Sequence, residues 1–224
     1  MATTLTKIDA SEYLVDGEAL AGSDLAAEGT EGHVLTSNGT DDKPTWQEPS
    51  GLVLLDTQEV SSAPTVNFSG LTGDYTLYKI VFYDVESASD DQIFVLRTSS
   101  DNGASFDSGA SDYKYVNIAL SATGSTGDTV DNAASSIRLT ATGAGWGFGT
   151  GSNEVGDGEI TIFNPQGTNH TKVLSDITYI TSSGNHAMAR SAGSRASTDP
   201  VDAVQLLFGS GDIETGTFKL YGLK

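Results

Sequence analysis

Apolar and polar residues alternate along most of the chain from Leu52 onward, in short segments separated by clusters of glycine, asparagine, aspartate and serine. Alternation with a period of two is the pattern of a strand that buries one face, and such polar clusters are typical of turns. No segment shows the spacing of an amphipathic helix, and no unit repeats at a fixed period. The predicted strands cover residues 52–56, 65–68, 75–85, 92–98, 113–121, 136–142, 159–164, 173–181, 187–190, 201–208 and 215–223.

Roughly ten short strands in this arrangement predict an all-β fold, an antiparallel β-sandwich of the jelly-roll type. The alternation also predicts which side chains face the core. In residues 113–121 we expect Val116, Ile118 and Leu120 to point inward, because they are the most apolar members of that segment. In residues 159–164 we expect Ile160 and Ile162 to do the same.

The first fifty residues lack this pattern. Their apolar positions are sparse, and Gly17 and Gly22 interrupt any helix. About fifty residues of this composition cannot bury a core alone, so they gain order only against another chain. We therefore predict two parts: residues 1–50, a largely irregular segment for attachment or trimerisation, and residues 51–224, a β-sandwich head.

Within the first part, Val34, Leu35 and Thr36 are expected to form a short strand. The dipeptide Asn38-Gly39 supplies the residues that a two-residue hairpin turn needs, and the chain becomes extended again from Pro44 to Trp46. Because Trp46 lies beside two prolines, we expect it to pack between subunits and not to bind a ligand.

The composition narrows the classes of function. The chain has 26 Gly, 5 Pro and no Cys, which fits many short strands and excludes disulfides, thiolate zinc sites and cysteine nucleophiles. With 11 basic and 30 acidic residues the formal charge is −19, which argues against nucleic acid as a partner. The N-terminus has no signal-peptide pattern and no apolar run reaches membrane-spanning length, so we expect synthesis in the cytoplasm without membrane insertion.

The segment most suggestive of ligand binding is the glycine-rich stretch from Gly143 to Gly151. Its alternating glycines leave Trp146 and Phe148 on a flexible scaffold, and aromatic faces stack on sugar rings and anchor interfaces. In the alternative interpretation, Trp146 closes one end of the sandwich or lies at a trimer interface. A second candidate is the segment 183–199, whose basic residues Arg190 and Arg195 suit an acidic glycan or a neighbouring subunit.

The sequence gives little support for catalysis or for a cofactor. The three histidines lie in turns without metal-ligand spacing, and no serine lies in a nucleophile elbow. The acidic segment from Asp101 to Asp107 lacks the ligand order of a calcium loop, and we interpret it as a turn whose side chains accept local backbone hydrogen bonds. We therefore expect no catalytic residues, no metal and no cofactor, and we expect that the protein is not an enzyme.

The segment from Gly32 to Gln47, GHVLTSNGTDDKPTWQ, resembles an element of phage tail-fibre and other virion fibre proteins that usually precedes a C-terminal globular head. Residues 78–85, 96–113 and 216–222 are similar in patches to the C-terminal β domains of such proteins. The resemblance implies a bacteriophage virion protein of the receptor-binding type, located in the virion and homotrimeric. Its N-terminus, including Val34, Leu35 and Trp46, would join other virion proteins of the tail or capsid, or pack subunits. Its head would contact the host surface, with a polysaccharide as one receptor.

Two alternatives remain open at this point. The first is a capsid decoration or head-fibre protein that binds and stabilises the shell. The second is a free carbohydrate-binding module, which suits the β body but leaves the N-terminal element unexplained.

Overall fold

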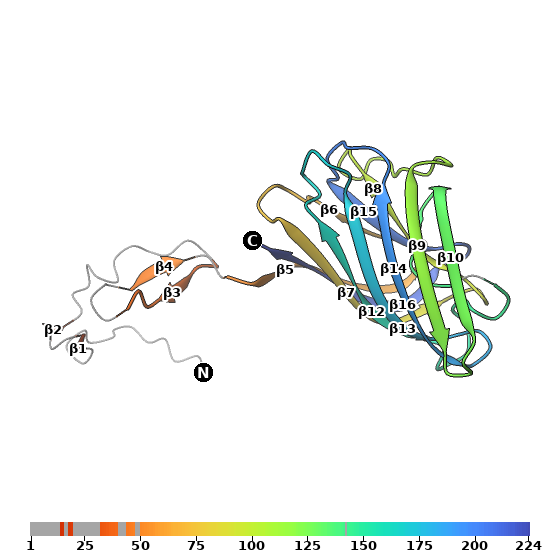
Figure 1. Ribbon diagram of the computed structural model, residues 1–224. Helices are drawn as coiled ribbons and strands as arrows, with labels where there is room; N and C mark the ends of the chain where they lie inside the picture. The colour runs from red at the N-terminus through yellow and green to blue at the C-terminus, as the bar shows by residue number, and fades with distance from the viewer. Residues whose placement is uncertain (1–13, 16–17, 20–31, 40–43, 48–49, 142) are drawn as a thin grey trace. The chain divides into compact units, whose positions relative to one another are not determined.

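The computed structural model describes residues 14–15, 18–19, 32–39, 44–47, 50–141 and 143–224. The chain separates into two units, Met1–Ser50 and Gly51–Lys224. Throughout the described ranges the regular elements are strands, and they pair in antiparallel fashion (Figure 1). The predicted all-β fold is therefore confirmed.

The described part of the first unit consists of two small hairpins. Their strands are β1 (Leu14–Val15) with β2 (Glu18–Ala19), and β3 (Val34–Thr36) with β4 (Thr45–Gln47). The predicted two-residue turn is wrong, because Thr36 pairs with Thr45 and the connection therefore spans residues 37–44. The Asn38 carboxamide instead reaches β4, donating to Thr45 Oγ1 over 3.0 Å. The predicted helix breaks at Gly17 and Gly22 lie outside the described residues.

The second unit contains an eight-stranded and a four-stranded sheet. The order in the larger sheet is β10-β9-β14-β13-β12-β7-β16-β5, and in the smaller sheet it is β11-β8-β15-β6. The strands are β5 (Leu52–Ala63), β6 (Val66–Ser69), β7 (Leu77–Ser87), β8 (Phe94–Ser99), β9 (Tyr113–Ser121), β10 (Thr126–Ala134), β11 (Ile137–Arg138), β12 (Gly156–Phe163), β13 (Lys172–Ile180), β14 (His186–Arg195), β15 (Ala203–Phe208) and β16 (Ile213–Leu223).

The strand order is that of a jelly roll with two inserted hairpins. When β9–β10 and β13–β14 are set aside, eight strands remain, and their sheets read first-eighth-third-sixth (β5-β16-β7-β12) and second-seventh-fourth-fifth (β6-β15-β8-β11). This double Greek key is the jelly-roll arrangement that the alternation pattern led us to expect. The two inserted hairpins continue the larger sheet beyond β12, and we call these four strands the extension (Figure 1).

β5 and β14 are longer than the predicted strands 52–56 and 187–190, and two further differences from the prediction have a physical reason. β10 is absent from the predicted strands, because this edge strand contains one large apolar side chain, Val130, and so shows no apolar alternation. The predicted strand 136–142 shortens to the two residues of β11, after which the chain enters the glycine-rich stretch. Leu139 still donates its amide proton to the carbonyl of Phe94, so pairing fades gradually beyond β11.

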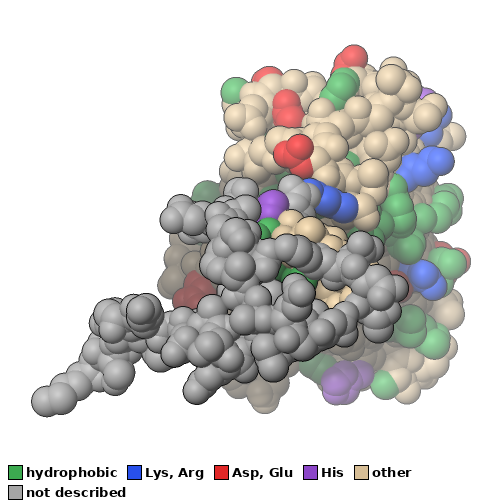
Figure 2. Space-filling model, turned by 90° about the vertical axis from the view of Figure 1, so that its left-hand side faces the viewer, with side chains coloured by type: hydrophobic (Ala, Val, Ile, Leu, Met, Phe, Trp, Pro, Cys, Tyr) green, Lys and Arg blue, Asp and Glu red, His purple; other side chains and the backbone are tan. Residues whose placement is uncertain are grey.

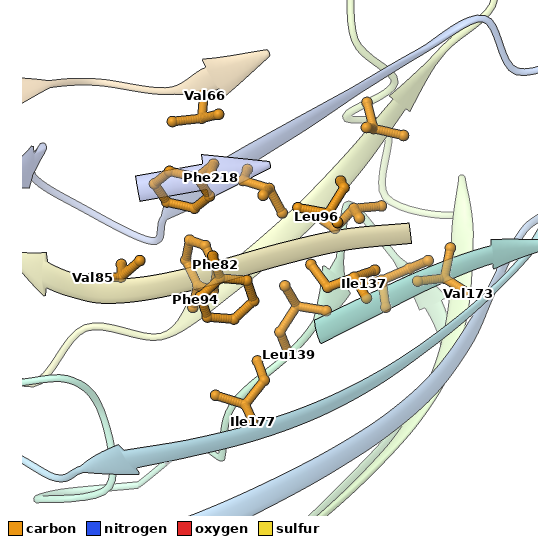
Figure 3. Packing of buried hydrophobic residues seen from close by; sticks show 14 of the residues in the cluster. Val66, Phe82, Val85, Phe94, Leu96, Ile137, Leu139, Val173, Ile177 and Phe218 are labelled. Atoms are coloured by element: carbon orange, nitrogen blue, oxygen red, sulfur yellow. The ribbon is translucent and has the colours of Figure 1, made fainter. Parts of the chain in front are cut away.

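The core lies between the two sheets and is rich in aromatic rings. Phe82 of β7 and Phe218 of β16 face Phe94 of β8, with ring centroids 5.5 and 6.5 Å from that of Phe94 (Figure 3). Phe208 of β15 packs against the same ring at 5.1 Å. As predicted, the isoleucines of β12 are buried among the residues of this cluster.

The predicted orientation of β9 is wrong. Val116, Ile118 and Leu120 point to solvent, whereas Tyr113, Tyr115, Asn117, Ala119 and Ser121 face inward. Several inner positions of the extension are occupied by small residues, and the chain around β11 approaches this face closely. A Cβ atom added to Gly193 of β14 would lie 2.7 Å from the Ile137 side chain, and one added to Gly127 would lie 3.1 Å from Cβ of Ala141. The larger aliphatic side chains of β9 are therefore on the other face.

Candidate functional site

The glycine-rich stretch is hydrogen-bonded to the body of the sandwich, in contrast to the flexible scaffold that its sequence predicted. The Asp91 carboxylate accepts hydrogen bonds from the backbone amides of Gly145 (3.0 Å) and Gly147 (2.9 Å) and from Ser182 Oγ (3.1 Å). Burial raises the pKa of Asp91, but these hydrogen bonds outweigh it and hold the pKa below its ordinary value. The stretch thus behaves as part of the sandwich.

Phe148, predicted as a ligand-binding residue, lies in the core. Its side chain is 0% exposed, and its ring stacks on Tyr179 with a centroid distance of 5.1 Å and an interplanar angle of 10°. Its backbone exchanges two hydrogen bonds with Gln92, of 2.8 and 2.9 Å. Trp146 is partly buried and packs against the same core, while its carbonyl accepts a hydrogen bond from the Tyr179 hydroxyl. This placement of Trp146 matches the alternative in which it closes the sandwich.

The two arginines have opposite environments. Arg195 is 5% exposed, and its guanidinium donates to Asp107 Oδ2 (2.6 Å), to the Asp199 carbonyl (2.8 Å) and to Ser100 Oγ (3.1 Å). These contacts connect the end of β14 to the loops that contain Asp107, Ser100 and Asp199, and the burial of Arg195 leaves little of it for contact with a ligand. Arg190 is exposed on β14, where its Nε atom lies 3.3 Å from Asp176 Oδ1 of β13. Of the two, only Arg190 can take part in surface recognition.

The acidic turn after β8 has the structure predicted for it. The Asp101 carboxylate accepts hydrogen bonds from the Ser105 hydroxyl and amide and from the Ser99 hydroxyl. These bonds, the Ser105 hydroxyl first among them, lower the pKa of Asp101 to about 2. Within the described ranges, no group of three or more His, Cys, Asp or Glu side chains is placed to hold a metal ion. The described parts of the chain also contain no helix with the length and apolar character of a membrane span.

In the first unit, the β3–β4 hairpin exposes all three residues predicted to pack against other chains. Val34 is 49% exposed, Leu35 43% and Trp46 39%. Leu35 and Trp46 are directly paired across the hairpin, so their apolar side chains are neighbours. The hairpin therefore presents apolar surface.

An exposed apolar surface of the second unit lies on the outer face of the extension. We call it the outer apolar patch; its members are 47 to 74% exposed. Cross-strand pairing brings them together, since the β9 residues lie beside their β10 and β14 partners. In Figure 2 this outer face forms the right-hand side of the molecule, where hydrophobic and basic side chains gather. The patch consists of Val116, Ile118 and Leu120 of β9, Val130 of β10 and Met188 of β14.

An open groove of about 960 Å³ adjoins the patch. Phe163 of β12 and Leu174 of β13 form part of its apolar lining, and Lys114 and Lys172 add two cationic groups. The sequence pattern missed both the patch and the groove, because it assigned the apolar residues of β9 to the core. The signal was present in Tyr113 and Tyr115, which form the competing inward face of the same strand.

Comparison with known proteins leaves the family open: the chain matches no protein-family model, no curated protein and no solved structure.

Proposed function

We propose that the chain is a structural protein of a bacteriophage virion, of the tail-fibre and receptor-binding type. Residues 1–50 join the chain to other virion proteins, and residues 51–224 form a head that contacts the host surface, with a polysaccharide as the receptor class. The working form is a homotrimer. The role is adhesive, and no catalytic step, metal or cofactor is assigned to it.

The observation that carries this proposal is the segment from Gly32 to Gln47. Its sequence resembles the fibre element, and it contains a hairpin that exposes Val34, Leu35 and Trp46. Exposed apolar side chains on so small a hairpin favour packing against another chain, because a two-stranded hairpin alone is marginally stable. A β-sandwich of jelly-roll type follows it in the chain, in the order that the resemblance implies.

The hydrogen bonds that hold the glycine-rich stretch against the sandwich reduce the set of residues that could contact a receptor. With Phe148 and Arg195 buried, the remaining candidates from the sequence are Arg190 and the exposed part of Trp146. Arg190 lies on the outer face of the extension, whereas Trp146 packs against the inner side, near Gly127. Receptor contact through these two residues would therefore use separate surfaces.

Immunogold electron microscopy with an antibody against the full-length chain tests the proposal on purified particles. Gold at the tail or its fibres is the expected result. Gold distributed over the capsid would support the decoration or head-fibre alternative, and the absence of gold on particles would refute a virion role. A glycan array probed with the same full-length chain then tests the receptor class, with the expectation of binding to bacterial surface polysaccharides.

A further inference from the structure

The outer apolar patch belongs to a face of the head that is unusually balanced in charge. The second unit carries 20 acidic and 9 basic residues, so most of its surface is strongly negative. The outer face of β12, β13, β14, β9 and β10 carries three basic side chains, Lys114, Lys172 and Arg190, and four acidic ones, Asp128, Asp157, Glu159 and Asp176.

Some of these charges are already paired on the face itself. Arg190 lies 3.3 Å from Asp176, and Glu159 lies 2.8 Å from Lys79 of β7. An acidic glycan would have to compete with these carboxylates for the cations. The centre of the face is aliphatic, with Ile118 64% and Val130 74% exposed, and aliphatic side chains lack the flat ring on which a sugar stacks. The face therefore suits a protein partner better than a saccharide.

The charge distribution also indicates which protein. Two copies of a chain with a formal charge of −19 repel one another when their acidic surfaces meet. A nearly neutral face with an apolar centre removes that repulsion and provides area to bury from water. Charge balance on this face is thus what self-association of so acidic a protein requires.

The size of the face is sufficient for a stable contact. Five strands spaced about 4.8 Å apart and about nine residues long, at about 3.3 Å per residue, cover a projected area of roughly 700 Å². A standard protein interface buries about 800 Å² of accessible surface on each partner, and accessible area exceeds projected area because side chains protrude. The face can therefore form an interface of ordinary size.

We propose that the outer face of the extension, centred on the outer apolar patch, is the surface through which the head binds a second copy of this chain. The inference deepens the proposed function and rests on it for the expectation that the working form is an assembly. It assigns Arg190 to subunit contact, which leaves the exposed part of Trp146 as the candidate for receptor contact. It assigns the inserted hairpins a role: they supply a surface for subunit contact beside the complete jelly roll.

The first experiment compares the solution mass of the full-length chain with that of two variants, by light scattering after size exclusion. Ile118→Asp places a charge at the centre of the patch on an exposed side chain, so the fold should persist; near-ultraviolet circular dichroism checks that it does. Asn67→Asp is the matched control: it adds the same charge on an exposed position of β6 in the other sheet, and its Oδ atom can still accept from Gln205. Val130→Asp, on the edge strand, replaces Ile118→Asp if the latter fails to fold.

We expect the wild-type chain and Asn67→Asp to be assembled, and Ile118→Asp to associate at least about thirtyfold more weakly, the size of effect that a central interface residue gives. Equal masses for wild type and Ile118→Asp would overturn the inference while leaving the virion role intact. A monomeric wild-type chain across the concentrations of the assay would overturn it as well, and gold labelling would still decide the virion role separately.

A second measurement probes the burial of the patch directly, by the reactivity of one of its own side chains. Met188 lies in the patch, and trypsin releases it in the peptide 173–190, because cleavage follows Lys172 and Arg190. Peroxide oxidises an exposed methionine to its sulfoxide, which mass spectrometry quantifies. We expect Met188 to react several-fold more slowly in the assembled wild-type chain than in Ile118→Asp. Equal rates in an assembled wild type would show that another surface holds the copies together.

Discussion

Replacement of Phe148 by alanine tests the conclusion that the glycine-rich stretch belongs to the core. The side chain is 0% exposed, and three aromatic rings surround it: Tyr179 at 5.1 Å, Phe208 at 5.2 Å and Phe94 at 6.1 Å between centroids. Truncation of a buried phenylalanine to alanine costs about 3–5 kcal/mol of unfolding free energy. Close aromatic pairs contribute about 0.5–1.5 kcal/mol beyond the buried area, which places the expected cost near the middle of that range or above it.

We therefore expect Phe148→Ala to lower the free energy of unfolding by about 4 kcal/mol, a large fraction of the 5–15 kcal/mol typical of a domain. For a domain of this size the melting temperature should fall by about 8–16 °C. Phe148→Leu keeps most of the volume and should cost less than about 1.5 kcal/mol.

Urea unfolding followed by circular dichroism measures both variants, at one fixed protein concentration because assembly makes stability depend on concentration. A loss of less than about 1 kcal/mol for Phe148→Ala, within the range of an ordinary surface substitution, would falsify the core assignment. In that case the ring would be free to meet a ligand, as its flanking glycines had suggested. As a control, the slope of the unfolding free energy against urea concentration should be the same for wild type and variants, which shows that the denatured state is unchanged.

Three further predictions concern other contacts. Arg195→Lys should lower the free energy of unfolding by about 1–3 kcal/mol, because lysine keeps the charge but loses the hydrogen bonds to the Asp199 carbonyl and to Ser100. Arg195→Met should lower it by about 3–5 kcal/mol, because methionine also leaves Asp107 unpaired. Urea midpoints that coincide for the two variants would show that the ion pair contributes nothing. Burial raises the pKa of Tyr113 and of Tyr179 from 10.0 to about 12, so the stability that they contribute is complete below pH 10 and is lost as the pH rises towards 12. The loss is about 3 kcal/mol for each tyrosine, so tyrosinate absorbance should appear together with loss of circular dichroism in this window, and ionisation of every tyrosine near pH 10 in a still folded head would contradict the shift. Gly147→Ala should lower the melting temperature, because the added Cβ would lie 2.5 Å from a backbone carbon of the facing chain; an unchanged melting curve would show that the glycine is dispensable there.

The sequence predicted the parts of the fold that depend on local pattern. In the first half of β7 the burial alternates residue by residue, and Tyr78, Ile80 and Phe82 are all buried as their spacing indicates. The jelly-roll class followed from the number and spacing of such strands, because few architectures accommodate so many short antiparallel strands. Period-two patterning suffices wherever one face of a strand is clearly more apolar than the other.

β9 shows where that reasoning fails. Both of its faces contain apolar groups, and the choice between them depends on how closely another segment approaches. Beside β9, Gly193 of β14 lies so close to Ile137 of β11 that a Cβ atom would be 2.7 Å from that side chain, and the side-chain amide of Asn117 donates to Ser191 Oγ over 2.5 Å. Neither the close approach nor the partner on β14 is visible in the local sequence.

The candidate site could be predicted only in part for a related reason. Flanking glycines made Phe148 look mobile, but the carboxylate that fixes the stretch is Asp91, more than fifty residues earlier. The buried arginine poses the same difficulty, since Arg195 meets Asp107 from a distant loop. The residue types indicated which side chains could bind a ligand, but long-range contacts determined which of them remain exposed to do so.

The positions of the inserted hairpins in the chain set the order in which their strands can pair during synthesis. β9–β10 joins the rest of the larger sheet only through β14, whereas β13–β14 continues directly from β12. The ribosome, however, releases residues 113–134 long before residues 186–195. Translation proceeds at about 5–20 residues per second, so β14 is synthesised roughly 4–15 s after β9, and β9 lacks this neighbouring strand until then. During that interval β9 has an unpaired edge beside aliphatic side chains that no second copy yet covers, and this combination favours aggregation between neighbouring nascent chains on a polysome.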